Sequence, residues 1–152
     1  MRICVLHEIP DDSALREQWN ALVFQMRHPQ VFYTYEWARA VQLGYGRMLC
    51  PLLVLGYDEE GRLMGVAALA APKGQPVSFL CANTGDYCDF VAAEQDAGDF
   101  VSQVLRVLQR EGHGGDLVLT NFPEDSPSYA ALTGAAKLNK LHIYRRTAYL
   151  CA

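Results

Sequence analysis

The strongest constraint on the fold is a pair of apolar runs joined by a short polar turn. Leu49–Tyr57 reads LCPLLVLGY, Arg62–Ala71 reads RLMGVAALAA, and DEEG lies between them. Two strand-like runs joined by a few residues that include glycine predict a β-hairpin. Both runs are almost continuously apolar, so we expect other elements of the chain to cover both faces of this hairpin.

Two segments before the hairpin are predicted to be helices. The first begins at Ser13, a candidate N-cap, and its apolar residues recur at helical spacing on one face. The pair His28-Pro29 then breaks the helix. The second helix is capped at Thr34 and is expected to stop at Gly44.

After the hairpin, strand-like and helix-like segments alternate. Helices are predicted over Glu94–Gln109, ending at Gly112, and over Ser126–Leu138, with Ser126 as N-cap. Further strands are predicted at Arg2–Ile9, Val77–Cys81, Asp116–Asn121 (a buried strand) and Leu141–Cys151. This order predicts an α/β (α+β) fold with a mixed, largely antiparallel central sheet flanked by helices.

Length and composition favour one globular domain. The chain has 152 residues, of which 51% are hydrophobic and 20% charged, a balance typical of folded domains. A chain of this size can bury a core without a metal or disulfides. The net charge of -4 argues against nucleic acid as a partner, since such proteins gather basic residues on one face.

The sequence also predicts the compartment. Its longest apolar run, Met64–Ala71, is far shorter than the ~20 residues of a membrane-spanning helix. The five cysteines form no C-x-x-C pair, and no signal-peptide pattern opens the chain. We therefore expect a cytoplasmic protein with no membrane span.

A concentration of polar residues follows the predicted strand Val77–Cys81. Ser78–Phe90 reads SFLCANTGDYCDF. Gly85 can adopt a positive φ and either Asn83 or Asp86 can close an Asx turn, so a simple turn is one reading. Two carboxylates, a phenol and an amide could equally form a polar wall for a substrate amine or hydroxyl. The residues alone leave both readings open.

Metal and thiol chemistry are less favoured in this stretch. A zinc site needs four Cys or His ligands at short paired spacings, whereas Cys81 and Cys88 are seven residues apart and the histidines are scattered. A nucleophilic Cys88 needs a base or a positive field to form its thiolate, and the carboxylates of Asp86 and Asp89 oppose that charge. We expect no metal and a bystander cysteine.

One motif suggests a cofactor loop and fails on its position. Gln109–Gly114, QREGHG, fits the R/Q-x-x-G-x-G/A pattern with which acetyl-CoA-dependent N-acetyltransferases hold pyrophosphate. In those enzymes the loop opens a helix, so that backbone amides face the phosphates. Here Gln109, Gly112 and Gly114 follow a predicted helix and present its carbonyls, so we reject them as a cofactor site.

Several blocks, taken in order, resemble a known family. They are FYTYEWARAVQLGYG, PLLVLGYDEEGRLMGVAALA, VSFLCANTGDYCDFV and GDLVLTNFPEDSPSYAAL, within a match over residues 19–150. The resemblance is to the N-terminal half of the acetyltransferase family associated with bacterial cellulose biosynthesis. That family belongs to the GNAT (Gcn5-related N-acetyltransferase) superfamily and is akin to the Fem-type aminoacyltransferases, which carry two GNAT-like halves.

The resemblance implies a single GNAT-like domain over residues 1–152, as the half of an acyl-CoA-dependent N-acyltransferase that shapes the acceptor site. Acetyl-CoA or another acyl-CoA would serve the full enzyme, whereas this chain alone would bind none and be inactive. The acceptor would be a small molecule or a saccharide or peptide precursor, and the partner a second GNAT-like domain or a second copy. The alternative is a non-catalytic GNAT-like module for binding or dimerisation.

The resemblance also implies which side chains contact the substrate. The segments YTYEW and TGDYCDF would face the cleft between the halves, which makes seven residues candidates: Tyr35, Glu36, Trp37, Asn83, Asp86, Tyr87 and Asp89. No motif assigns a catalytic role. Asp86 or Asp89 would serve as a general base only if burial favoured its protonated form.

Overall fold

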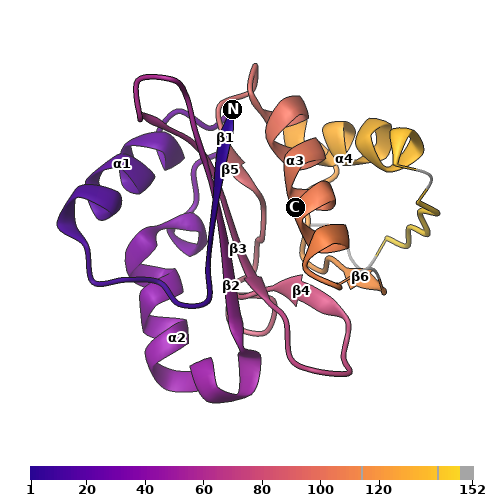
Figure 1. Ribbon diagram of the computed structural model, residues 1–152, viewed down its shortest axis with the longest axis horizontal. Helices are drawn as coiled ribbons and strands as arrows, with labels where there is room; N and C mark the ends of the chain where they lie inside the picture. Colours follow the sequence, from indigo (N-terminus) through magenta and orange to yellow (C-terminus); the bar gives the residue numbers. More distant parts are fainter. Residues whose placement is uncertain (114, 140, 148–152) are drawn as a thin grey trace.

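A computed structural model describes residues 1–113, 115–139 and 141–147. Within them, helices cover both faces of one six-stranded sheet. The elements are β1 (Arg2–Leu6), α1 (Ser13–Val23), the 3-10 turn η1 (Val31–Tyr33), α2 (Tyr35–Leu49), β2 (Pro51–Tyr57), β3 (Leu63–Ala70), β4 (Val77–Phe79), β5 (Val91–Ala92), α3 (Ala97–Arg110), β6 (Leu117–Val118) and α4 (Pro127–Leu138). Figure 1 shows α1 and α2 on one face and α3 and α4 on the other. The predicted α/β class is confirmed.

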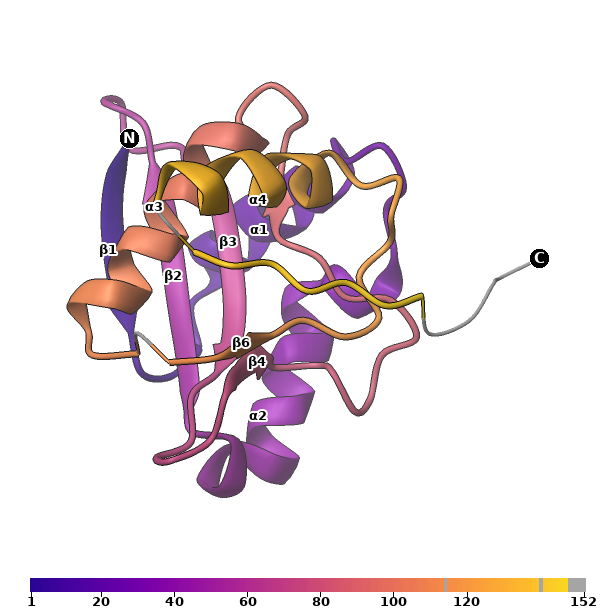
Figure 2. The same ribbon diagram turned by 90° about the vertical axis from the view of Figure 1, so that its right-hand side faces the viewer.

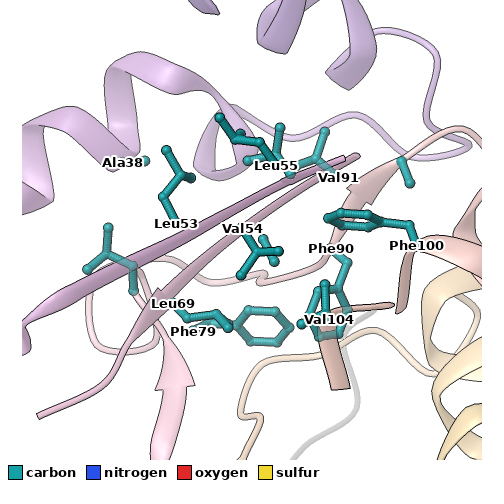
Figure 3. Packing of buried hydrophobic residues seen from close by; sticks show 14 of the residues in the cluster. Ala38, Leu53, Val54, Leu55, Leu69, Phe79, Phe90, Val91, Phe100 and Val104 are labelled. Atoms are coloured by element: carbon teal, nitrogen blue, oxygen red, sulfur yellow. The ribbon is translucent and has the colours of Figure 1, made fainter. Parts of the chain in front are cut away.

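The hairpin β2–β3 forms the centre of the sheet. The strand order is β1-β2-β3-β4-β6, with β5 also paired to β3. Every pair is antiparallel except β4–β6, which is parallel. In β2, Leu53 lies toward α2 whereas Val54 lies toward Phe79 and Val104 (Figure 3). The two faces of the hairpin are thus both buried, as its continuous apolar runs predicted.

A pair of glycines forms a recess for one aromatic ring. Gly56 and Gly65 are partners in the β2–β3 register, and the ring of Phe100, fully buried in α3, packs on them. A Cβ atom at Gly65 would overlap this ring, and one at Gly56 would lie 3.0 Å from it. The missing side chains therefore let α3 approach the sheet closely and fix its position.

Two predicted helix ends are wrong. The N-cap of α1 is Asp12 rather than Ser13, because the Asp12 carboxylate accepts hydrogen bonds from two backbone amides at 2.8 and 3.0 Å. Helix α2 begins at the Thr34 cap as predicted but passes through Gly44. It ends at Cys50, which takes the left-handed turn with φ 48°. The left-handed residue, rather than the glycine, decides where the helix stops.

The last two predicted strands differ most from the structure. Asp116–Asn121 contributes only the two residues of β6, which are half-buried and exposed, because β6 lies at the edge of the sheet. Residues 141–147 contain no strand and are exposed. The rest of the predicted strand Leu141–Cys151 lies outside the described residues. Residues 141–147 follow α4 as an irregular yellow trace in Figure 2.

Candidate functional site

The polar stretch of the sequence is an excursion from the edge of the sheet. Both β4 and β5 pair with β3: Leu69 lies opposite Phe79, and Val66 lies opposite Val91. If β4 continued in its own register, Val66 would lie opposite Ala82, so nine additional residues bulge out before pairing resumes. We call residues 80–90 the edge loop. The edge loop therefore lies between two strands that pair with the same neighbour, β3, and does not connect distant parts of the sheet.

Asn121 holds both limbs of the edge loop. Its Nδ2 donates to the carbonyl oxygens of Ala82 (3.1 Å) and Gly85 (2.9 Å), and its own carbonyl oxygen accepts from the Cys88 amide (2.8 Å). Its φ of 57° is in the left-handed region, which asparagine tolerates better than most residues. Sequence reasoning treated Asn121 only as the end of a strand. An asparagine there is a turn signal, but it does not point to a particular loop.

Gly85 lets the edge loop pack against η1. The positive φ that a glycine permits is not used here, since Gly85 is not among the residues with positive φ in the described part of the chain. Instead, a Cβ atom at Gly85 would lie 3.2 Å from the Cβ of Phe32 and 3.2 Å from the carbonyl oxygen of Tyr87. The glycine is required for close approach. The two segments implied to contact substrate therefore do meet in the structure.

Asp89 is the most perturbed carboxyl of the site. Burial raises the pKa of Asp89 to about 7, although hydrogen bonds from Ser126, the Phe90 amide and Ser128 oppose this rise, and the charge of Asp125 adds to it. The Phe90 amide lies 2.7 Å from Oδ1. Ser126 and Ser128, at the start of α4, are the buried polar side chains found in the described residues. A carboxyl in this setting exchanges its proton near neutral pH.

Tyr33 lies next to Asp89. Burial, followed by the charge of Asp89, raises the pKa of Tyr33 well above its usual value, so the phenol keeps its proton at neutral pH. The backbone is anchored as well, because Trp19 Nε1 donates to the Tyr33 carbonyl oxygen at 2.7 Å. Tyr33 is absent from the predicted site. The only signal for it was the crowd of aromatic residues around YTYEW, most of which are core residues.

Tyr33 and Asp89 stand between two small cavities, each with about 20 Å³ of interior space, which is room for one water. The inner cavity reaches toward the core and is lined by Trp19, Phe79, Cys81 and Cys88. The second, which we call the outer pocket, is lined by Arg27, His28, Glu94, Asp125, Ser126 and Ser128 together with Asp89 and Tyr33.

Two ion pairs lie around the outer pocket. Arg27 Nη2 is 2.5 Å from Glu94 Oε1, and His28 Nε2 is 3.4 Å from Asp125 Oδ2. They connect the chain after α1 with the β5–α3 loop and with the start of α4. All four side chains are exposed, so each pair is worth at most about 1 kcal/mol and can exchange partners readily.

Two of the predicted contact residues make hydrogen bonds that hold the fold. Tyr35 is buried, and its hydroxyl donates to the Pro10 carbonyl oxygen at 2.5 Å. Glu36 is exposed and accepts a hydrogen bond from Asn20 Nδ2 at 2.8 Å, which ties α2 to α1. Neither residue lines the two cavities.

Trp37 lies close to the edge loop without lining either cavity. Its ring packs edge-on against Phe32 with the centroids 4.9 Å apart, and Phe32 in turn contacts Gly85. The Trp37 Nε1 is buried and has no hydrogen-bond partner within the described residues. Trp37 therefore supports the packing of the loop on η1.

The remaining candidates separate on the edge loop itself. Asn83 and Asp86 are exposed, and Tyr87 is half-buried and acts on Tyr33 through its charge when ionised. Of the predicted residues, Asp89 lines both cavities, and these three line neither. The structure thus distinguishes between the two aspartates that the sequence left equivalent.

The cysteines of the edge loop are unsuited to nucleophilic catalysis. Burial raises the pKa of Cys81 and of Cys88 to about 12 in each case, so both stay as thiols at neutral pH. Across the described ranges, no three His, Cys, Asp or Glu side chains are grouped so that they could hold a metal ion.

The residues present do not fit the pyrophosphate of an acyl-CoA. The rejected motif lies at the C-terminal end of α3: Gly112 has φ 79°, and the His113 amide donates to the Leu108 carbonyl oxygen at 2.8 Å; Gly114 lies outside the described residues. Helix N-termini follow strands at β1–α1, β5–α3 and β6–α4, and acidic residues lie at each: Asp11 and Asp12 precede α1, and Glu124 and Asp125 precede α4. The β5–α3 junction is an example. It carries Glu94, Asp96 and Asp99, whose charges repel phosphate.

No helix formed by the described residues is both long and apolar enough to cross a membrane. Comparisons of the chain with protein-family models, with curated proteins and with solved structures find no match.

Proposed function

We propose that this domain binds the acceptor of an acyl-transfer reaction and that Asp89 is the base that takes the acceptor's proton. The observation that carries this proposal is a carboxyl with a pKa of about 7 at a pocket that also contains a protonated phenol. A base whose pKa lies near the working pH is partly ionised and still holds a transferred proton well, so it is an effective general base.

The neighbours of Asp89 suit this role. Tyr33 keeps its proton and can donate a hydrogen bond to an amine or hydroxyl next to the carboxylate. The Ser126 hydroxyl stabilises the ionised form of Asp89, whereas the single proton of the Ser128 hydroxyl is shared with the Phe90 carbonyl oxygen, 3.2 Å away. The contact with Ser126 favours the carboxylate near pH 7. When the acceptor nitrogen or oxygen attacks the thioester carbonyl of the acyl-CoA, its lone pair forms the new bond to the acyl carbon and its proton passes to Asp89. The acyl–sulfur bond then breaks, and the CoA thiolate leaves and takes up a proton from solvent.

The acyl donor is supplied from outside this chain under the same proposal. The acidic β5–α3 junction and the reversed glycine motif both disfavour pyrophosphate, which supports the role of an acceptor-side half beside a second GNAT-like domain. The mixed sheet with helices on both faces is compatible with the GNAT-like fold that the sequence resemblance implies. Fold alone does not define a reaction, so the proposal depends on Asp89.

Acyl transfer by the full enzyme, in which the proposed donor-binding domain is present together with this one, provides the test. Release of free thiol from acetyl-CoA would be followed with a panel of primary amines for the wild type, Asp89→Asn and Asp86→Asn. Loss of a general base should lower kcat by at least about 100-fold in Asp89→Asn. Asp86→Asn, an exposed change in the same loop, should retain the activity. Equal rates in the two variants would refute the proposal.

A second candidate is a non-catalytic dimerisation module. It is favoured by apolar side chains left exposed on the edge strand β6, at the end of α4 and in the segment after α4: Val118 (45% exposed), Leu138 (83%), Ile143 (44%) and Tyr144 (95%). In this alternative a second copy covers them. Sedimentation would show a dimer that dissociates on Val118→Lys, and Asp89→Asn would then affect no activity.

A further inference from the structure

The outer pocket presents charges of both signs at different depths. Asp89, with Tyr33, lies where the pocket adjoins the core. Arg27 and His28 lie at the exposed mouth, with side chains 48% and 59% exposed. A ligand that enters this pocket therefore meets a carboxyl at the inner end. At the outer end it meets the Arg27 guanidinium and the His28 imidazole, which are paired with Glu94 and Asp125.

We propose that the acceptor is an α-amino acid, or a molecule that ends in one, with its amino group beside Asp89 and its carboxylate on Arg27 and His28. This inference rests on the proposed function, since it names the chemical class of the acceptor. The amino group of a zwitterion can pair with Asp89 and its carboxylate with the Arg27 guanidinium and the His28 imidazole, whereas a simple amine offers nothing to these two donors.

The size of the pocket fits this orientation. Its interior of about 20 Å³ has room for a group the size of a water molecule, such as an amino group. The carboxylate and the rest of the ligand then remain at the mouth. The side chain of the amino acid points away from Asp89, so the pocket recognises the shared head group.

The ion pairs at the mouth supply the carboxylate site by exchanging partners. Arg27 and His28 now face Glu94 and Asp125. A ligand carboxylate replaces these two acids, and Arg27 can bind it through two parallel hydrogen bonds. Because the existing pairs are exposed, their loss costs little free energy. Glu94 therefore acts as a competitor of the ligand.

Binding to the whole chain, measured by NMR titration, tests the inference. The probes are glycine, methylamine, which lacks the carboxylate, and acetate, which lacks the amine. Glycine should bind more tightly than either. Arg27→Gln should weaken glycine about fivefold, the value expected for one exposed ion pair, and leave methylamine unchanged. Glu94→Gln should strengthen the binding of glycine. Arg16→Gln, an exposed change on α1, should leave the binding of both glycine and methylamine unchanged.

The outcomes separate this inference from the proposed function. If methylamine binds as tightly as glycine and Arg27→Gln has no effect, the zwitterion is overturned while an amine acceptor stands. If glycine binds as described but Asp89→Asn transfers acyl groups at the wild-type rate, the catalytic proposal fails and the binding site stands. If no probe binds, the amino-acid site is overturned.

Discussion

Replacing Asp89 by asparagine should stabilise the protein at alkaline pH and leave it unchanged in acid. The folded protein holds the Asp89 proton more tightly than the unfolded chain does, because burial raises its pKa from 3.8 to about 7. The stability that this group contributes is therefore fully present below pH 3.8 and is lost as the pH rises through about 7. Asparagine has no proton to lose in this range.

The pKa change sets the size of the effect. A rise from 3.8 to about 7 corresponds to an upper limit of about 4 kcal/mol, since each pKa unit is worth about 1.4 kcal/mol. Asp89 is half-buried, so water screens part of this difference, and we take about 2 kcal/mol. Asp89→Asn should thus exceed the wild type by about 2 kcal/mol at pH 8 and match it near pH 4.

Urea denaturation of both proteins at several values between pH 4 and pH 8 measures this difference directly. Comparing the two proteins removes the titration of groups that they share. Asp86→Asn is the matched control, and its stability should stay within about 0.5 kcal/mol of the wild type at every pH. A difference between Asp89→Asn and the wild type that is constant from pH 4 to pH 8 would refute the reasoning about burial.

Two further changes test how the site is held. Asn121→Ala removes both hydrogen bonds to the edge loop and strains a residue at φ 57°, so it should cost about 2–3 kcal/mol of unfolding free energy. Asn121→Gly should cost less unfolding free energy than Asn121→Ala, because glycine adopts the positive φ without strain. Equal losses in the two variants would argue against a contribution from strain. Gly65→Ala should cost at least about 1–3 kcal/mol through overlap with Phe100, measured by thermal unfolding. Adding Phe100→Leu to Gly65→Ala should recover part of the lost stability. If Gly65→Ala alone caused no loss of stability, the close packing of Phe100 on Gly65 would be contradicted.

The sequence predicted the centre of the fold better than its edges. The hairpin could be recognised because two apolar runs around a glycine turn have few other structures available, and burial on both faces followed from the same pattern. Asp116–Asn121 shows the same reasoning fail. An apolar run can lie in a central strand or at an edge, and only the tertiary neighbours decide between them.

The site was predictable as a region and not as a set of residues. The loop with its two aspartates stood out by composition, but Asp86 and Asp89 differ only in which of them the fold buries. Tyr33, Ser126 and Ser128 come from a 3-10 turn and from the start of α4, far apart in sequence, and no local pattern brings them together. Asn121 acts through hydrogen bonds to backbone carbonyls. Such bonds do not depend on the side chains of the residues that accept them, so the sequence of the loop does not reveal them.

Because of the recess for Phe100, the effect of a substitution at one position of the chain should depend on the residue present at a distant position. Gly65 both receives this ring and pairs with Ala92 in β5, so a side chain there would move the helix and the strand that follows Asp89 together. Among random variants of this protein that are selected for folding, a substitution at Gly65 should be found mainly together with a second substitution that replaces Phe100 by a smaller residue. A screen for variants in which the pKa of Asp89 is altered would then recover mutations on the α3 face of the sheet as well as in the edge loop.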